Sequence, residues 1–282
     1  MANSHQQKSP EFNVYCLVST KINVIKIGGN VLDNPAQLDQ FLTDFAFIQG
    51  PKVLVHGGGK IASDLSKQLG IEPNMVNGRR ITDDDTLRVV TMVYGGLLNK
   101  NLVAQLQARG CNSLGLTGAD ANVIPAHKRP VKDIDYGLVG DVESPEQVNV
   151  RFLASLAEQG LTPVFAALTH DGQGSLLNTN ADTIASTLAV ALSREFEVNL
   201  VYCFEKKGVL LDVEDETSVI HHLQPDNYAE LKAQGSIFAG MLPKLDNAFA
   251  ALQAGVNAVI IGHAGEIQTI AAGEKAGTRI TL

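Results

Sequence analysis

Residues 24–29 read VIKIGG and residues 52–59 read KVLVHGGG, and these two stretches most strongly indicate the architecture of the chain. Each is a short apolar run, rich in β-branched residues, that ends in glycines, which is typical of a buried strand followed by a tight turn. A helical pattern follows each run, over residues 35–49 and 60–69. This alternation predicts β-α-β units around a mostly parallel sheet.

The same alternation extends over the rest of the chain. Asn77-Gly78 is a hairpin signal, and residues 123–142 indicate a second hairpin that covers one lobe. Further strands are expected at residues 113–116, 163–167, 200–204 and 258–261, and further helices at 83–107, 147–158, 181–192, 226–233 and 244–254. We therefore expect an α/β fold with an N-terminal extension at 1–22, an N-terminal lobe at 23–180 and a C-terminal lobe at 181–282.

The composition argues against several classes of partner. The formal net charge is -8 and no basic stripe is present, which argues against nucleic acid. The 3 cysteines are scattered and lack C-x-x-C spacing, which argues against disulfides and a cysteine-bound metal and favours the cytoplasm. No apolar stretch approaches the ~20 residues that cross a bilayer, so we expect no membrane partner.

The two glycine turns are candidate anion sites. Glycine at the end of a parallel strand lets backbone N–H groups approach a ligand, and the following helix adds partial positive charge. A single Gly-Gly pair is more often a plain turn, but three consecutive glycines after His56 favour a ligand site. The chain contains neither G-x-G-x-x-G nor G-x-x-x-x-G-K-[ST], which argues against a dinucleotide fingerprint and a Walker A loop.

Two lysines are candidates for contact with that anion. Lys26 interrupts the apolar run 24–27, where a buried charge needs an anionic partner. Lys244 follows Pro243 at the expected start of a helix. A lone lysine in a strand is more often an edge charge or one half of an ion pair, so neither residue identifies a function alone.

Five motifs together resemble those of the amino-acid kinase family, in the family's order and at similar separations. They are VIKIGGN (24–30), VHGGG (55–59), NGRRIT (77–82), LNTNAD (177–182) and GMLPK (240–244). The resemblance covers residues 23–282 and is strongest to the members that phosphorylate N-acetyl-L-glutamate in arginine biosynthesis. It implies a three-layer αβα sandwich, with an N-terminal lobe that binds the acylated glutamate and transfers the phosphoryl group and a C-terminal lobe that binds ATP.

The same resemblance assigns roles to individual residues. It implies that Lys26 and Lys244 contact the transferring phosphoryl group and that Asp182 orients both lysines. Such an arrangement suits the chemistry, because phosphoryl transfer needs stabilisation of charge on the phosphoryl oxygens more than it needs a base. Taken singly, Asp182 would only complement a helix dipole.

Substrate and nucleotide contacts are also implied by the resemblance. The implied substrate-binding residues are Gly58, Gly59, Arg80, Asn178 and Asn180. The implied ATP-binding residues are Gly28, Gly29, Glu205, Gly208, Val209, Leu210, Ser236, Ile237 and Phe238. ATP and Mg²⁺ are the expected cofactors, and the ion is expected on the ATP phosphates without a direct protein ligand.

One stretch departs from the family pattern. The family usually carries Thr or Ser followed by Asp-Val after the strand that enters the nucleotide lobe, and this chain reads FEKK at 204–207. Glu205 retains a carboxylate with a longer reach, whereas Phe204 replaces a hydroxyl with a ring that either stacks or fills space. We still expect ATP to bind there.

The identity of the acceptor stays partly open. Arg80 and Asn178 favour an N-acylated amino acid over the carbamate, glutamate or aspartate that related kinases use, although an arginine in a hairpin is otherwise a solvated charge. The acyl group is acetyl or succinyl. A succinyl group needs a wider pocket or one more cation, which Arg79, Lys128 or Arg129 could provide.

A function of another class is a non-catalytic, amino-acid-binding regulatory domain, since the same fold occurs as a sensor fused to other enzymes. The presence of both lysines and of Asp182 argues against it. The arginine-inhibited members of the family are hexamers with an N-terminal helix, whereas the first 20 residues here carry Pro10 and a strand-like patch. We therefore expect an arginine-insensitive homodimer.

Overall fold

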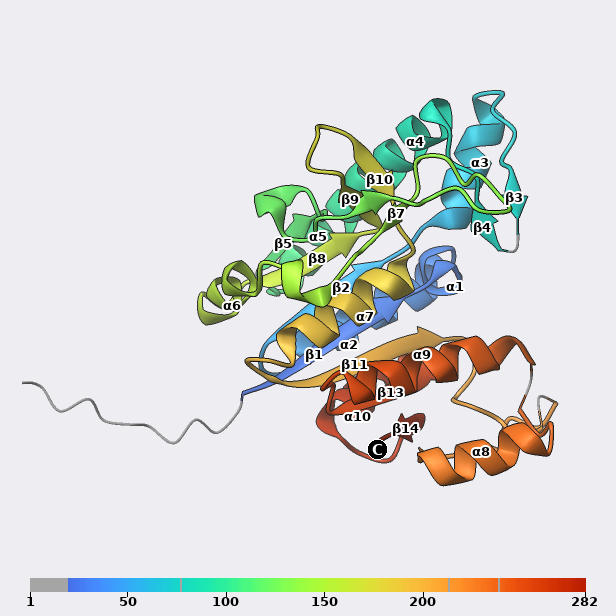
Figure 1. Cartoon of the computed structure of the whole chain (residues 1–282). Coiled ribbons are helices and arrows are strands. Elements are labelled where there is room, and N and C mark those ends of the chain that lie inside the picture. Colours follow the sequence, from blue (N-terminus) through green and yellow to red (C-terminus); the bar gives the residue numbers. More distant parts are fainter. Residues whose placement is uncertain (1–19, 77, 213, 238) are drawn as a thin grey trace, which may run out of the picture.

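The chain folds around one eight-stranded sheet. Its strands cross the middle of the molecule in Figure 1. The computed structural model describes residues 20–76, 78–212, 214–237 and 239–282. The strand order is β12 (His222–Leu223), β14 (Thr278–Ile280), β13 (Ala258–His263), β11 (Glu197–Phe204), β1 (Lys21–Ile27), β2 (Lys52–His56), β8 (Thr162–Ala166) and β5 (Ser113–Leu116). All neighbours from β13 to β5 are parallel, and β14 runs antiparallel to β13.

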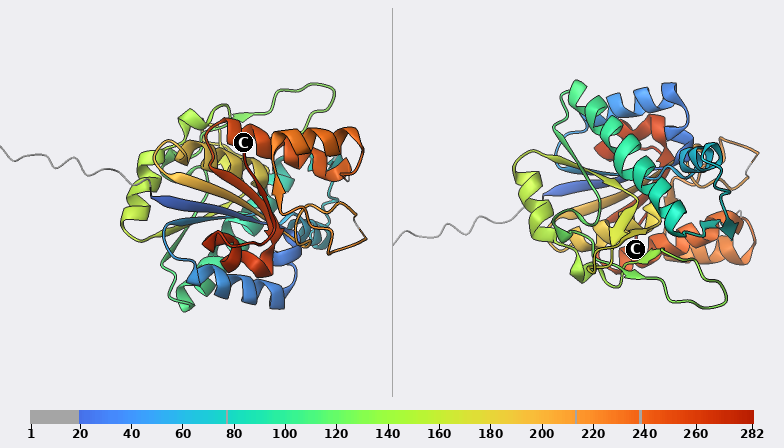
Figure 2. Two further views of the ribbon diagram at one scale, coloured as in Figure 1. Left: turned by 90° about the horizontal axis from the view of Figure 1, so that it is seen from below. Right: turned by 90° about the horizontal axis from the view of Figure 1, so that it is seen from above.

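Helices cover both faces of the sheet, so the predicted three-layer αβα sandwich is confirmed (Figure 2). One layer contains α2 (Pro35–Phe47), α5 (Asn99–Ala108) and α10 (Ile267–Ala272). The opposite layer contains α7 (Ala181–Leu192) and α9 (Leu242–Gln253). The remaining helices are α1 (Gly29–Leu32), α3 (Gly59–Gln68), α4 (Asp84–Val90), α6 (Val150–Glu158) and α8 (Pro225–Ala233).

Helix α7 links the sequence pattern to the core. It starts at the predicted residue because the Asn180 side chain accepts hydrogen bonds from the N–H groups of Asp182 and Thr183, which satisfies two free donors of the first turn. Its small apolar residues are buried against β1, β2 and β11. The first turn of the helix thereby holds Asp182 beside Lys26, near the carboxyl end of β1.

Among the described residues, three antiparallel hairpins lie outside the main sheet. Two of them match predicted hairpins and pair β3 (Met75–Val76) with β4 (Arg79–Arg80) and β6 (His127–Lys128) with β7 (Gly140–Asp141). The third pairs β9 (Leu168–His170) with β10 (Leu176–Asn178). Arg80 of β4 and Asn178 of β10 line one cavity.

The strand register places the two glycine turns side by side. In the parallel pair β1 and β2, Ile27 lies opposite His56, so Gly28 and Gly57 follow at the same edge of the sheet. On the other side of β1, Ile27 lies opposite Cys203, one residue before the end of β11. The carboxyl ends of these three strands therefore meet, and this is the edge at which open α/β sheets bind ligands.

Several features were not predicted. The long helix expected at 83–107 contains a π-helical segment, η1 (Thr91–Leu98), between α4 and α5. Strands β12 and β14 and helix α10 were missed because segments of two to six residues carry little periodicity. Residues 1–19, on which the expected arginine-insensitive assembly rests, lie outside the described residues. The division into lobes at 180 and 181 stays a prediction, since one sheet runs through both parts.

Candidate active site

One cavity of about 640 Å³, the site cavity, opens at the edge where the two glycine turns meet. Most of the sequence-predicted site residues converge on it from separate parts of the chain. Its walls include Lys26, Gly28, Gly29, Gly58, Gly59, Arg80, Asn178, Asn180 and Asp182. The side of α9 that faces α7 closes the cavity with Asn247, Ala250, Ala251 and Ala254.

The charge pair at the base of the site cavity joins β1 to α7. Lys26 Nζ lies 2.8 Å from Asp182 Oδ1, and the lysine side chain is only 12% exposed. The buried ammonium of Lys26 is therefore matched by the carboxylate of Asp182, as burial of a charge requires. This pair leaves the remaining N–H donors of Lys26 available to a ligand oxygen.

Lys244 lies close to this pair although it is not part of the cavity wall. Burial lowers the pKa of Lys244, the negative charge of Asp182 opposes this fall, and the positive charge of Lys26 adds to it. The negative charge of Glu205 also opposes the fall in the pKa of Lys244. The ammonium groups of Lys26 and Lys244, which are far apart in the sequence, thus both lie close enough to the carboxylate of Asp182 to interact with its charge.

Phe204 explains the departure from the family pattern. The Lys244 Nζ lies 3.7 Å from the centroid of the Phe204 ring, which is a cation–π contact. The Phe204 ring, at the end of β11, therefore packs against the ammonium group of Lys244. The part that the Phe204 ring plays towards a nucleotide stays a prediction.

Arg80 is buried at the glycine-rich side of the site cavity. Its Nη2 donates to the Gly59 carbonyl and to Ser63 Oγ, each at 2.7 Å, and the residue is 7% exposed. Its Nη1 is buried and meets no acceptor within the described chain. Arg80 is therefore not a plain solvated charge in a hairpin, and its free Nη1 is a donor suited to a carboxylate ligand.

The two asparagines are placed differently. Asn178 donates from Nδ2 to the Thr82 hydroxyl at 3.0 Å, which fixes its amide beside Arg80's hairpin. Asn180 uses its side-chain oxygen to cap α7. Both residues line the site cavity, and their part in substrate binding stays a prediction.

The residues expected around the adenine and ribose form a separate group. Gly208, Val209 and Leu210 follow β11, and the Val209 N–H donates to Thr278 Oγ1 at 2.8 Å. A Cβ at Gly208 would lie 2.7 Å from the same hydroxyl, so this turn packs closely on β14. Six of the expected ATP-binding residues do not line the site cavity: Glu205, Gly208, Val209, Leu210, Ser236 and Ile237. Phe238 lies outside the described residues.

Sequence reasoning missed Tyr94. This side chain projects from η1, packs against Gly58 and lies beside the guanidinium of Arg80. Burial raises the pKa of Tyr94, and the nearby charge of Arg80 opposes that rise. The available signal was Gly95-Gly96 inside an otherwise helical pattern, since π-helical segments often occur at functional sites.

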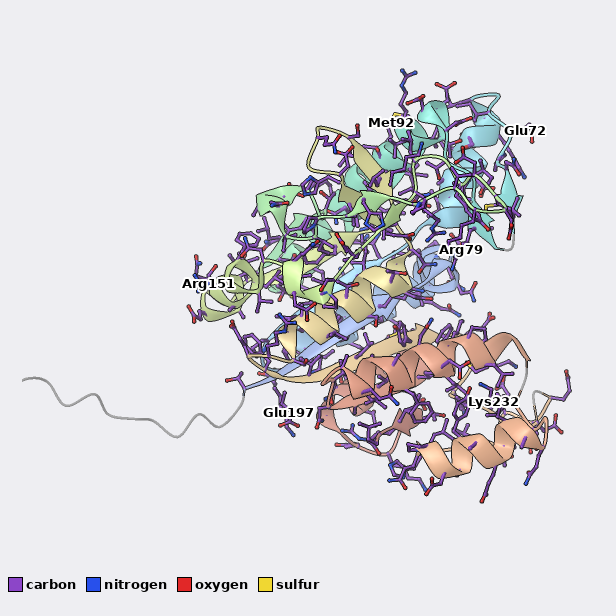
Figure 3. The ribbon with its side chains drawn as sticks, in the orientation of Figure 1. Glu72, Arg79, Met92, Arg151, Glu197 and Lys232 are labelled. Carbon is purple, nitrogen blue, oxygen red and sulfur yellow. The ribbon has the colours of Figure 1, made fainter. Side chains whose placement is uncertain are left out.

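A second cavity of about 560 Å³ adjoins the first. Arg79, labelled in Figure 3, and Arg129 line both cavities. Arg129 forms an ion pair with Asp141 and lies over the Tyr136 ring, and its Nη1 is buried without an acceptor in the described part of the chain. Two positively charged side chains, those of Arg79 and Arg129, therefore lie where the two cavities join.

The described residues offer no site at which side chains alone could bind a metal ion. Residues 20–76, 78–212, 214–237 and 239–282 contain no group of three or more His, Cys, Asp or Glu side chains that could hold an ion. The same residues contain no helix long and apolar enough to span a bilayer.

Comparison with known proteins identifies the family of the chain. A sequence model of the amino acid kinase family matches residues 21–263. Acetylglutamate kinase from Phocaeicola vulgatus is 60% identical over 247 residues, covering 88% of this chain and 95% of that protein. Acetylglutamate kinase from Cytophaga hutchinsonii is 58% identical over 262 residues, covering 92% and 98%.

A solved structure extends the comparison to the fold. N-acetylglutamate synthase from Neisseria gonorrhoeae, in complex with coenzyme A and N-acetyl-glutamate, superposes with a TM-score of 0.77 at 21% identity. The match covers 93% of this chain and 59% of that one, and at such low identity it concerns the fold alone. The family match and the two close relatives show that the chain belongs to the amino acid kinase family.

Proposed function

We propose that the chain transfers the γ-phosphoryl group of ATP to the γ-carboxylate of N-acetyl-L-glutamate, the second step of arginine biosynthesis. The observation that carries the proposal is the convergence of Lys26, Lys244 and Asp182 beside two glycine turns. Relatives at 58% and 60% identity that are named acetylglutamate kinase support the choice of acceptor. A non-catalytic regulatory domain would have no need of this charged group.

The proposed reaction requires little acid–base chemistry. A γ-carboxylate oxygen attacks the γ-phosphorus, the bond to the β–γ bridging oxygen breaks, and ADP leaves with that electron pair. Lys26 and Lys244 stabilise the charge on the transferring group, and Asp182 holds Lys26 in place. Mg²⁺ would reach the site on the ATP phosphates and neutralise part of their charge, because it keeps much of its hydration shell.

The substrate α-carboxylate is assigned to Arg80. Arg80 lines the site cavity together with Asn178, its buried Nη1 has no acceptor in the described chain, and its Nη2 donates to the Gly59 carbonyl and to Ser63 Oγ. A side chain locked in this way loses little entropy when it binds a carboxylate. Replacement of Arg80 would therefore weaken acceptor binding more than nucleotide binding.

N-succinyl-L-glutamate is a second candidate acceptor, and one observation favours it. Arg79 and Arg129 lie where the site cavity meets the second cavity, and the buried Nη1 of Arg129 lacks an acceptor in the described chain. A second carboxylate on the acyl group would satisfy that donor. An acetyl group would leave it unpaired.

A coupled assay of ADP release, with N-acetyl-L-glutamate and N-succinyl-L-glutamate in parallel, tests both proposals. We expect ATP-dependent turnover with N-acetyl-L-glutamate and, in Arg80→Gln, a KM for the acceptor raised ~10–100-fold, the effect of losing one charge-assisted hydrogen bond. Absence of ADP release with both acceptors would refute the kinase assignment.

The variant Arg129→Gln separates the two acyl groups. If succinyl is the natural group, kcat/KM is higher for N-succinyl-L-glutamate, and only this substrate loses efficiency in the variant. Lys128→Gln is the matched control, because Lys128 is exposed on the adjacent position and lines neither cavity. Equal effects of both variants on both substrates would rule out a specific role for Arg129.

We propose that the protein acts as an arginine-insensitive homodimer in the cytoplasm. The buried, free thiols of Cys111 and Cys203 suit a reducing compartment. Strand β5 ends the sheet and carries the exposed Leu114, and Met92 and Leu97 of η1 are also exposed apolar side chains. Light scattering should give twice the mass of one chain, and arginine should leave turnover unchanged; a hexamer or strong inhibition would contradict this assembly.

A further inference from the structure

His56 is a buried side chain for which the proposed reaction has no direct use. It ends β2, directly before the three glycines, and is 0% exposed. Its Nδ1 lies 2.9 Å from the Gly57 carbonyl oxygen, and its Nε2 lies 3.2 Å from Asn99 Nδ2. Both ring nitrogens are therefore engaged.

The hydrogen bonds determine which nitrogen carries the proton. Asn99 Nδ2 also lies 2.8 Å from the Val164 carbonyl, which can only accept, so the group that faces it must be the NH₂. The second hydrogen of this amide then points at His56 Nε2, which must accept. The proton is left on Nδ1, from which it is donated to the Gly57 carbonyl.

The ring stays neutral under ordinary conditions. Burial lowers the pKa of His56 to about 4, while the bond to the Gly57 carbonyl opposes that fall. The neutral Nδ1–H tautomer therefore persists around pH 7. It acts as a fixed donor rather than as an acid or base.

The bond to Gly57 sets the direction of the next peptide N–H. The peptide between Gly57 and Gly58 is trans, so its C=O and N–H groups point in opposite directions. When the C=O points back to the buried imidazole, the N–H of Gly58 points away from it. No acceptor in the described chain meets this N–H, and Gly58 lines the site cavity.

We propose that His56 is a positioning residue that, held by Asn99, turns the Gly57–Gly58 peptide so that the Gly58 N–H faces the anionic ligand in the site cavity. The inference rests on the proposed phosphoryl transfer, in which this donor meets the transferring group or the acceptor carboxylate. The segment η1 takes part, because Asn99 follows it directly and Tyr94 and Leu98 within it pack on Gly58. A donor fixed before the reaction needs no reorganisation during it.

The alternative is that His56 only fills the core and satisfies its own polar atoms. Both interpretations predict a loss of stability when the ring is removed. They differ in what a donor at the Nδ1 position does. If His56 acts on the peptide, restoring that donor restores turnover; if it only fills space, the donor has no such effect.

The first measurement is nitrogen-15 NMR of the histidine-labelled full chain at pH 7. We expect one ring whose Nδ1 carries the proton and whose Nε2 does not, assigned by its loss in His56→Asn. A proton on Nε2, or a charged ring, would overturn the inference. This result does not depend on any substrate, so it stands apart from a failure of the proposed kinase activity.

The second measurement compares kcat and KM in His56→Leu and His56→Asn. Asparagine can place an N–H near the position of Nδ1, whereas leucine has no donor. We expect kcat to fall about 10–100-fold in His56→Leu with little change in KM, in line with a misdirected backbone donor. In His56→Asn, most of that loss should be recovered.

Leu106→Ala is the control for a plain core lesion, since Leu106 is fully buried in α5 and lines neither cavity. It should lower stability and leave kcat unchanged below its melting temperature. If His56→Leu and His56→Asn lose turnover equally, or if Leu106→Ala matches them, His56 has no positioning role. Addition of a nonhydrolysable ATP analogue should also shift the Gly58 amide resonance in the wild type, and an unmoved resonance would contradict the assignment.

Discussion

Replacement of Lys26 or Lys244 by alanine should lower turnover roughly a hundredfold or more, the effect of removing one preorganised charge contact from the transition state. Lys26 is 12% exposed and is held 2.8 Å from Asp182, so water cannot readily replace its ammonium. Lys244 is held over the Phe204 ring. The proposed function has both charges act on the transferring phosphoryl group, so kcat should fall more than the KM for either substrate changes.

Lys21→Ala is the matched control for Lys26→Ala. Lys21 begins the same strand, its side chain is 69% exposed, and its ion pair with Glu197 lies at the opposite end of β1. An exposed pair of this kind contributes little, so turnover and stability should stay close to wild type. Wild-type turnover in either Lys26→Ala or Lys244→Ala would overturn the proposed site.

The pH dependence of turnover offers a check on Lys244. Burial lowers the pKa of this ammonium below the ordinary lysine value, and Asp182 only partly offsets the effect. The cation is the active form and is lost as the pH rises through this lowered pKa. Turnover should therefore decline on the alkaline side at a lower pH than an exposed lysine would give, and Lys244→Arg, which stays charged, should remove that decline.

Gly58→Ala should lower the free energy of unfolding by about 3 kcal/mol and abolish most turnover. The backbone at Gly58 has φ 144°, a conformation that residues with a Cβ rarely adopt. A Cβ there would also lie 2.3 Å from Leu98 Cδ1 and 3.2 Å from Tyr94 Cδ1. The turn must move to relieve this contact, and its N–H groups then leave the site cavity.

Two further variants separate the causes of that loss. Gly70 also has a positive φ, 74°, but a Cβ there meets nothing within 4 Å, so Gly70→Ala should cost only about 1 kcal/mol. The double variant Gly58→Ala with Leu98→Ala removes the side chain that clashes, and it should be less unstable than the two single losses added together. Chemical denaturation gives these values. A wild-type midpoint for Gly58→Ala would show that the turn is not confined as described.

Much of the site could be predicted because local chemistry and strand order are coupled. Parallel strands that follow one another along the chain expose their carboxyl ends at one edge, so glycine turns after β1 and β2 had to lie together. The cap of α7 was equally local, since Asn180 needs only the two N–H groups that follow it. The convergence of Lys244 on Lys26 was inferred from resemblance and not from spacing.

Other parts could not be read from the residues. Arg80 appears as a surface charge in a two-residue strand, and its burial depends on Gly59 and Ser63 of α3. Tyr94 lies beside Arg80 and belongs to η1, a π-helical segment that interrupts the expected helix. Neither contact can be recognised from hydrophobic periodicity, because each joins elements that are separated in the sequence.

The order of apolar runs, glycines and caps along the chain was sufficient for the parallel α/β sheet and the position of its ligand edge, because these features depend on interactions between near neighbours in sequence. The roles of the candidate residues came from the resemblance to the amino-acid kinase family. The pairing of Lys26 with Asp182, the Phe204 support beneath Lys244 and the direction of the Gly58 N–H depended on packing. Those contacts join distant segments at distances of about a hydrogen bond, and such distances are set by how helices and strands settle against one another in the folded core.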